Sequence, residues 1–203
     1  MAYAYDIFIS YKRGKETNLW IKEHFEPLLE HAVALELGRI PKIYRDDLLN
    51  DGGTWPLDLG IALGSSRVLV PLWTKTYFHS EWCVLELSTM LDREQEMGCR
   101  TPSNPLGLII PTVLHDYETV QPKLAHVQYR EIRKCFNVRM QRNSERAEQL
   151  ADALAAVAPG IACAIENAPV WQQQWPTVTA ASFLQALWHK EQPQQTTVPG
   201  FSS

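Results

Sequence analysis

The segment Arg67–Trp73 has the sequence RVLVPLW, a nearly uninterrupted apolar run from which the fold can be worked out. The run is short and lacks the alternation of a strand that has one face in water. It is typical of a central strand that helices cover on both faces, as in parallel sheets. The flanking sequence should then supply further strands and the helices that join them.

Strand and helix patterns alternate on both sides of this segment. The further expected strands, the last of them weak, are Ala4–Ser10, Ile40–Arg45, Pro105–Val113 and Val127–Tyr129. The expected helices are Thr17–Leu37, Leu57–Gly64 and a segment that Ser80 caps and that ends near Met97. This order predicts an α/β fold with a five-stranded parallel sheet and helices on both faces. Functional residues should follow the carboxyl ends of the strands.

The last third of the chain is predicted to be a helical extension of the α/β domain. An Ala-rich helix over residues 143–157 is capped by Asn143 or Ser144, and a short piece continues to Ile165 after a break at Pro159-Gly160. A final helix is expected over Thr179–Lys190. The predicted division is an α/β domain at 1–140, a helical extension packed on it at 141–190, and a flexible tail or linker at 191–203.

Composition excludes several classes of protein. The 203 residues carry 19 Lys and Arg against 23 Asp and Glu, a net charge of −4, and 45% are hydrophobic. This balance excludes a disordered chain and disfavours nucleic acid as a partner. No signal peptide is recognisable, and no apolar stretch reaches the about 20 residues of a membrane-spanning helix, since the longest is interrupted at Asp152 and Pro159. The cysteines lack CxxC spacing and the histidines lack HxxxH spacing, so we expect reduced thiols, no metal site and a cytoplasmic protein.

Three motifs carry a resemblance to one family. Tyr5–Tyr11 reads YDIFISY, Arg45-Asp46 precedes Gly52-Gly53, and Ser80–Leu87 reads SEWCVLEL. In this order they resemble box 1, box 2 with its BB loop, and the Ser-x-Trp-Cys-x-x-Glu-Leu signature of Toll/interleukin-1 receptor (TIR) domains of the bacterial and plant enzymatic type. The resemblance covers roughly residues 3–140 and implies a flavodoxin-like fold. Box 3 of the family has no clear counterpart here.

The resemblance implies one of two functions. Some TIR domains are scaffolds that assemble signalling complexes. Others cleave NAD+ at the nicotinamide–ribose bond with one essential glutamate, which Glu86 matches here. We therefore expect an NAD+ nucleosidase with NAD+ as substrate and no cofactor, which releases nicotinamide plus ADP-ribose or a cyclic or conjugated ADP-ribose. Bacterial antiphage immune signalling is the expected setting, and the non-catalytic scaffold is the alternative.

Cleavage of the nicotinamide–ribose bond needs few protein groups. Nicotinamide leaves as a neutral molecule and needs no general acid, and the transition state is oxocarbenium-like. One carboxylate that stabilises the cation and holds the ribose hydroxyls is enough, and this is the role expected of Glu86. Helical spacing predicts an apolar stripe through Val84, Leu87 and Leu91. Trp82 and Glu86, four residues apart, should then lie on the face opposite that stripe.

Further substrate contacts are expected near the first strand. Lys12 and Arg13 follow it directly and could hold the pyrophosphate, for which the alternative is a solvated basic loop. Ser10, at the end of the strand, is the third candidate there. Tyr77, near the start of the Ser80 helix, is assigned to packing.

Three more candidates come from the BB loop and the signature helix. Trp55 resembles the aromatic residue that stacks on substrate or on a neighbouring subunit, and Trp82 is expected to contact the ligand or pack under a loop. Asp46 is a further candidate, although a structural role in the loop is the stronger alternative. Gly52-Gly53 would let the loop move as a gate.

The resemblance also implies partners. We expect self-association through TIR–TIR contacts that include the BB loop, Asp46–Pro56, and a sensor or effector protein as a further partner, with no direct contact to nucleic acid or a membrane. In active relatives one subunit's BB loop completes another's site, so the isolated chain should be weakly active until it oligomerises.

Two other functions of α/β folds are disfavoured. A serine hydrolase on this sheet would need a G-x-S-x-G elbow, which the chain lacks. A receiver domain would need an aspartate that accepts a phosphate at the end of the central strand, but that strand ends in Leu72-Trp73-Thr74.

Overall fold

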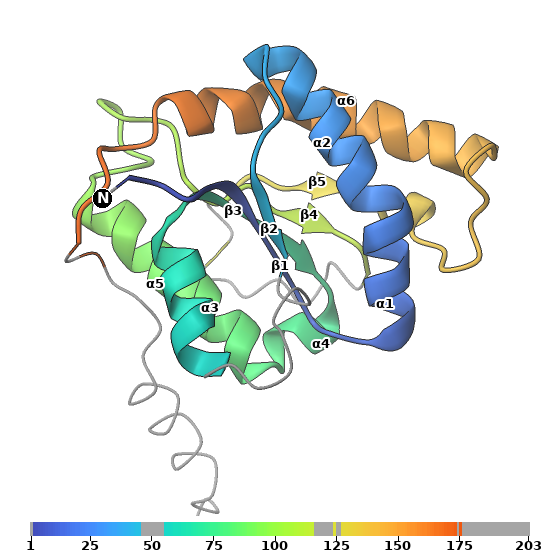
Figure 1. The fold of residues 1–203 in the computed structure, drawn as a ribbon, viewed down its shortest axis with the longest axis horizontal. Helices are drawn as coiled ribbons and strands as arrows, with labels where there is room; N and C mark the ends of the chain where they lie inside the picture. The colour runs from blue at the N-terminus through green and yellow to red at the C-terminus, as the bar shows by residue number, and fades with distance from the viewer. Residues whose placement is uncertain (1, 46–54, 116–123, 125–126, 174, 176–203) are drawn as a thin grey trace, which may run out of the picture.

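A computed structural model describes residues 2–45, 55–115, 124, 127–173 and 175. Its sheet has five strands, all parallel, in the order β2-β1-β3-β4-β5 (Figure 1). The strands are β1 (Tyr5–Tyr11), β2 (Ile43–Arg45), β3 (Ser66–Trp73), β4 (Thr112–Val113) and β5 (Arg130–Glu131). The predicted flavodoxin-like α/β fold is confirmed, and RVLVPLW forms the centre of the sheet.

Helices cover both faces of this sheet. They are α1 (Lys15–Trp20), the π-helical segment η1 (Ile21–Phe25), α2 (Glu26–Leu37), α3 (Trp55–Gly64), α4 (Lys75–Phe78), α5 (Glu81–Glu96), the 3₁₀ turn η5 (Arg133–Cys135) and α6 (Glu145–Glu166). One hydrophobic core lies between the sheet and α1, η1, α2 and α6, and a second lies between the sheet and α3, α4 and α5 (Figure 1).

Strand β1 alternates between the two cores. Ile7, Ile9 and Tyr11 face the core under α2 and α6, whereas Phe8 faces the core under α3 and α5. This period of two places neighbouring residues at the carboxyl end of β1 on opposite faces of the sheet. The side chains of Ser10 and Tyr11 therefore point to opposite faces of the sheet.

The fourth strand is shorter than the predicted Pro105–Val113. Only Thr112–Val113 forms a ladder with β3, although Ile109 makes an isolated parallel bridge to Leu69. The backbone N–H groups of Leu108 and Ile109 donate to Oε1 of Glu94, at 2.5 and 2.9 Å, while Leu69 still exchanges backbone hydrogen bonds with Leu108 and Ile110. The ladder is interrupted at Pro71 of β3, which has no N–H to donate to the neighbouring strand.

The first predicted helix is continuous through Pro27 but changes its winding there. The π-helical segment Ile21–Phe25 leads directly into α2, with Pro27 in the first turn of α2. A proline lacks an N–H group and clashes with the carbonyl four residues back, and a wider turn relieves both problems. The helix ends at Gly38 with φ +66°, the left-handed cap that glycine predicts.

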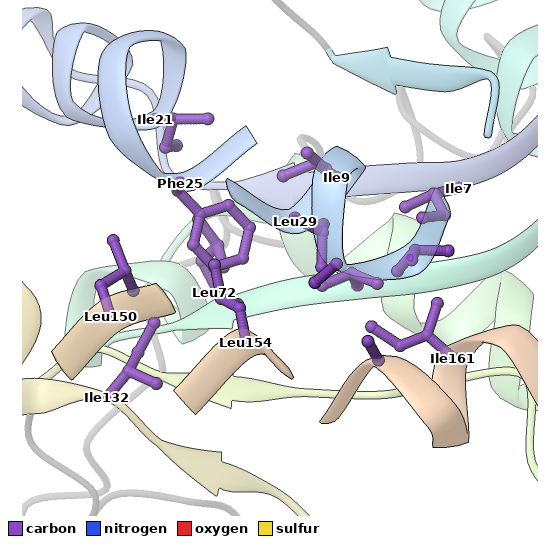
Figure 2. Close-up of a cluster of buried hydrophobic side chains, with 14 of the residues drawn as sticks. Ile7, Ile9, Ile21, Phe25, Leu29, Leu72, Ile132, Leu150, Leu154 and Ile161 are labelled. Carbon is purple, nitrogen blue, oxygen red and sulfur yellow. The ribbon is translucent and has the colours of Figure 1, made fainter. Parts of the chain in front are cut away.

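The predicted break at Pro159-Gly160 is wrong, because α6 is one helix of 22 residues that begins after the Ser144 cap. Pro159 lies on the exposed side, as does Ala155, whose carbonyl would have accepted the missing hydrogen bond and can be hydrated instead. Leu154 and Ile161 on the inner side are fully buried (Figure 2). Their burial holds the helix together across the proline.

By length and composition α6 could cross a membrane, contrary to the sequence prediction that no segment is long enough. In this fold the apolar side of α6 packs against the hydrophobic core. Leu150, Leu154 and Ile161 pack with Phe25, Leu29 and the β1 side chains in one core (Figure 2). The predicted domain boundaries remain predictions, and the predicted helix Thr179–Lys190 and the 191–203 tail lie outside the described residues.

Candidate active site

Glu86 lies on the inner face of α5, and only 2% of it is exposed. The stripe that α5 buries against the sheet includes Cys83 and Met90, which are spaced so that Glu86 falls between them. The predicted apolar stripe opposite Glu86 is therefore wrong. Val84 is 39% exposed, and Leu87 is buried on the same side as Glu86. Helix α5 therefore places the Glu86 carboxylate in the interior of the molecule.

A buried pair of hydroxyl groups joins Glu86 to β1 and α4. Ser10 Oγ donates to Oε2 of Glu86 at 2.5 Å and lies 2.9 Å from the Tyr77 hydroxyl. The Tyr77 hydroxyl also donates to the carbonyl oxygen of Cys83 at 3.2 Å. Ser10 and Tyr77 are both fully buried. The carboxylate is thus held from the central strand, at the carboxyl edge where parallel sheets place their sites.

The supply of protons fixes the direction of these bonds. Ser10 and Tyr77 have one hydroxyl proton each, and an ionised Glu86 can only accept. When Ser10 donates to Glu86, the Ser10 oxygen is left to accept from Tyr77, whose single proton is then shared between Ser10 Oγ and the carbonyl oxygen of Cys83. Burial raises the pKa of Tyr77 well above its ordinary value, with the nearby Cys83 and Glu86 adding to the effect, so the phenol keeps its proton.

The predicted contacts at the end of β1 have different surroundings. Ser10 is turned toward α4 and α5, where it binds Glu86. Lys12 lines a cleft of about 200 Å³ at the carboxyl edge, together with Tyr11 and with Lys75 of α4. Arg13 is exposed and is not among the residues that line this cleft. Contact of these three side chains with a substrate remains a prediction.

Trp82 is half-buried and packs against the core under α3 and α5. Asp46 and the Gly52-Gly53 pair lie outside the described residues. Trp55 begins α3, but its side chain also lies outside the described part. The proposed roles of Asp46, Trp55 and the BB loop therefore stay predictions.

Tyr77 is the functional candidate that the sequence prediction ranked below the others and assigned to packing. Its assignment to packing is correct as far as it goes, since the ring contacts Phe78 and is fully buried. The hydroxyl, however, is part of the Glu86 network. The available signal was its position, between the carboxyl end of β3 and the first turn of α5, where side chains from two elements meet.

The described residues contain no group of three or more His, Cys, Asp or Glu side chains that could hold a metal ion. What they do contain at the sheet edge is a carboxylate with a hydroxyl donor. That arrangement can stabilise a developing cation.

The strand order is that of a flavodoxin-like α/β domain, and the buried Glu86 lies at the carboxyl edge of its sheet. The TIR domain family matches residues 7–151, which is most of the chain. The chain therefore belongs to the TIR domain family.

A plant disease resistance protein matches about half of the chain. The chain is 30% identical over 94 residues to the disease resistance protein RPV1 of Vitis rotundifolia, an alignment that covers 46% of the chain and 6% of RPV1. It thus spans only a small part of that relative.

Solved structures are similar at low identity. The TIR domain of the Toll-related receptor TRR-2 from Hydra magnipapillata has a TM-score of 0.46 at 19% identity, covering 63% of this chain and 84% of that one. The TIR domains of the activated Roq1 resistosome, which recognises the pathogen effector XopQ, have a TM-score of 0.39 at 23% identity, covering 76% and 84%.

Proposed function

We propose that the chain is an NAD+ nucleosidase in which Glu86 is the catalytic residue. The observation that carries this proposal is the Ser10–Glu86 hydrogen bond of 2.5 Å at the carboxyl edge of the sheet. A carboxylate fixed by a buried hydroxyl is pre-organised, so it need not reorient when charge develops on the ribose. The nicotinamide–ribose bond breaks with its electron pair going to the nicotinamide nitrogen, and Glu86 stabilises the ribosyl cation until a nucleophile captures it.

The nature of the nucleophile sets the product. Capture by water gives ADP-ribose, and capture by a nitrogen of the adenine or by another nucleophile gives a cyclic or conjugated ADP-ribose. We propose Lys12, Arg13, Trp55 and Trp82 as substrate contacts, with Ser10 and Asp46 as supporting groups. Antiphage signalling in a bacterial cytoplasm is the proposed setting, by analogy with the immune roles in the names of the relatives.

The burial of Glu86 bears on regulation. At 2% exposure the carboxylate does not meet solvent, so a substrate reaches it only after the surrounding side chains move. We propose that self-association through the BB loop, Asp46–Pro56, drives this movement and completes the site. The TIR domains of Roq1 belong to an activated resistosome, and that assembly prompts this proposal.

A scaffold without catalysis is the second candidate, and the same burial favours it. A glutamate that is 2% exposed and bonded to a serine can serve folding alone. In that case Glu86→Ala leaves partner recruitment intact, whereas changes in the BB loop destroy it. For an enzyme, either change abolishes the signal.

The experiment that separates the two candidates is product analysis by mass spectrometry. The chain is incubated with NAD+ at high protein concentration with a crowding agent. The enzyme releases nicotinamide with an equal amount of an ADP-ribose product, and Glu86→Gln does not. Glu96→Gln is the matched control, because Glu96 is an exposed residue on the same helix. No nicotinamide from the unaltered chain would contradict the proposed enzyme.

A further inference from the structure

The chain after α6 lies at the amino edge of the sheet, where it passes the N-terminus (Figure 1). We call its residues 168–173 and 175 the C-terminal strap. The Tyr3 hydroxyl donates to the carbonyl oxygen of Pro169 at 2.8 Å. Trp171 Nε1 donates to the carbonyl oxygen of Gly64 at 3.2 Å. The strap is therefore bonded both to the N-terminus and to the end of α3.

A stack of four side chains fastens the end of the strap. The Tyr3 and Trp175 rings have their centroids 5.7 Å apart. On the outer side of Tyr3, Arg67 Cζ lies 4.5 Å from the ring centroid. On the other side, Arg93 Cζ lies 4.5 Å from the Trp175 centroid. Each guanidinium faces an aromatic ring in the geometry of a cation–π interaction, so the stack joins the N-terminus, β3, α5 and the strap.

Arg93 depends on this stack for its charge. It is fully buried, and burial lowers its pKa to about 10, so the guanidinium stays charged at neutral pH. It donates to the carbonyl oxygens of Ser66 and Leu63 at 2.9 and 3.3 Å. Among the residues that the structure describes, no carboxylate lies within salt-bridge distance of Arg93. Because a buried charge without a counter-ion is costly, the Trp175 ring is an important compensating contact.

Helix α5 connects the stack with the candidate active site. Arg93 and Glu86 are two turns apart on the buried face of this one helix. The strap also binds Gly64, the last residue of α3, whereas the first turn of α3 belongs to the BB loop. The BB loop and the strap thus act on opposite ends of α3. A strap that fixes α3 and α5 at the amino edge restricts the movement that would uncover Glu86.

We propose that the C-terminal strap is autoinhibitory: through Trp175 and Arg93 it holds α5 in the arrangement that buries Glu86. Release of the strap favours the arrangement in which α5 has moved, which is the one that assembly through the BB loop also favours. The hold on α5 is independent of catalysis. Its inhibitory effect rests on the proposed NAD+ cleavage, so the two are measured separately.

The hold on α5 is measured by alkylation of Cys83 in the full chain, followed by mass spectrometry. Cys83 is a free thiol one turn before Glu86, and it is 3% exposed. Movement of α5 exposes it without unfolding of the other core. We expect Trp175→Ala to raise the alkylation rate about tenfold, the factor for one desolvated cation–π contact, and Trp175→Phe to restore most of the protection.

Two controls separate the strap from a general loss of stability. Val170→Ala changes a strap residue that is 86% exposed and should leave the rate unchanged. Ile161→Val destabilises the core under α6 to an extent comparable with the loss of Trp175, and it too should leave Cys83 protected. The proposal is overturned if Trp175→Ala does not accelerate alkylation, or if Ile161→Val accelerates it as much.

The inhibitory effect is measured by nicotinamide release from NAD+ across a dilution series. We expect Trp175→Ala to reach half of its maximal specific activity at a several-fold lower protein concentration than the unaltered chain and Val170→Ala. Faster alkylation of Cys83 without this shift would overturn autoinhibition. If neither the unaltered chain nor any variant releases nicotinamide, the proposed NAD+ cleavage is contradicted and autoinhibition with it, whereas the alkylation rates still decide whether the strap holds α5.

Discussion

At the scale of single residues, the Glu86 site depends on hydroxyl groups that carry little sequence signal. Ser10 lies within box 1, and Tyr77 looks like one more aromatic core residue. Their bonds of 2.5 and 2.9 Å connect Glu86 with β1 and α4. The resemblance to the TIR signature singled out Glu86, whereas helical spacing placed it on the wrong face of its helix. The error arose because a buried carboxylate interrupts the apolar pattern from which the face is judged.

Tyr77→Phe tests the positioning role. The change removes the donor to Ser10 and leaves the ring in place, so Ser10 becomes free to turn away from Glu86. We expect kcat for nicotinamide release to fall several-fold with little change in KM, and the free energy of unfolding to fall by about 1 kcal/mol. Tyr129→Phe, at a residue 38% exposed, is the control. Equal effects of the two changes would contradict the role.

Asp6 supplies a pH dependence of stability. Burial raises its pKa, but hydrogen bonds from Arg39 and from the backbone of Lys42 outweigh burial and leave it below the ordinary value of 3.8. A lowered pKa means that the stabilisation is complete above the ordinary aspartate range and is lost as the pH falls through the folded pKa.

Asp6→Asn should therefore lower the free energy of unfolding by about 2 kcal/mol at pH 7, the magnitude of hydrogen bonds to a charged group. The difference from the unaltered chain should shrink as the pH falls below about 4. Urea unfolding at several pH values measures it, with the exposed Asp92→Asn as control. A difference that is constant with pH would contradict the assignment.

At the scale of elements, α6 shows where sequence reasoning succeeded and failed. The Ser144 cap was predicted, and its hydroxyl accepts from the N–H of Ala147 at 3.3 Å. The continuity of the helix through Pro159 was missed, because tertiary burial of Leu154 and Ile161 overrides a local helix breaker. The short β4 was also missed, although Pro71 in RVLVPLW lacks the N–H group that a continuous ladder with the neighbouring strand needs.

Leu154→Ala measures how far α6 belongs to the core. Leu154 is fully buried between α2 and the sheet, so a cavity and lost contacts should lower the free energy of unfolding by about 2–5 kcal/mol. Leu35→Ala, at a residue 71% exposed on α2, should cost less than about 0.5 kcal/mol. Chemical denaturation gives both values. A small loss for Leu154→Ala would mean that α6 is only loosely attached.

At the scale of the whole molecule, the carboxyl edge of the sheet holds the Glu86 network, and the chain after α6 runs to the opposite, amino edge. There Trp171 Nε1 donates to the carbonyl of Gly64 at 3.2 Å, and Trp175 lies over the Arg93 guanidinium at 4.5 Å. The overall α/β fold was predictable because β1 and β3 are apolar and the intervening helices are regular. The burial of Glu86 was not predictable, since it depends on contacts between α4, α5 and β1.

Assembly should make Glu86 accessible to substrate. If self-association moves the side chains that bury Glu86, nicotinamide release per chain rises with protein concentration, and crowding raises it further. Activity assays across a dilution series, run beside light scattering on the same samples, measure this. A specific activity that stays constant while the mass increases would contradict the link between assembly and catalysis.

The most direct test of the central claim is the rate of nicotinamide release from NAD+ by the assembled chain, compared between Glu86→Gln and Glu96→Gln. The substitution at Glu86 removes the negative charge but keeps an acceptor for Ser10, so folding should be preserved. We predict that Glu86→Gln lowers kcat by at least about a hundredfold, as expected when one pre-organised electrostatic group is lost, while Glu96→Gln retains the full rate. Equal rates for the two variants would contradict a catalytic role for Glu86.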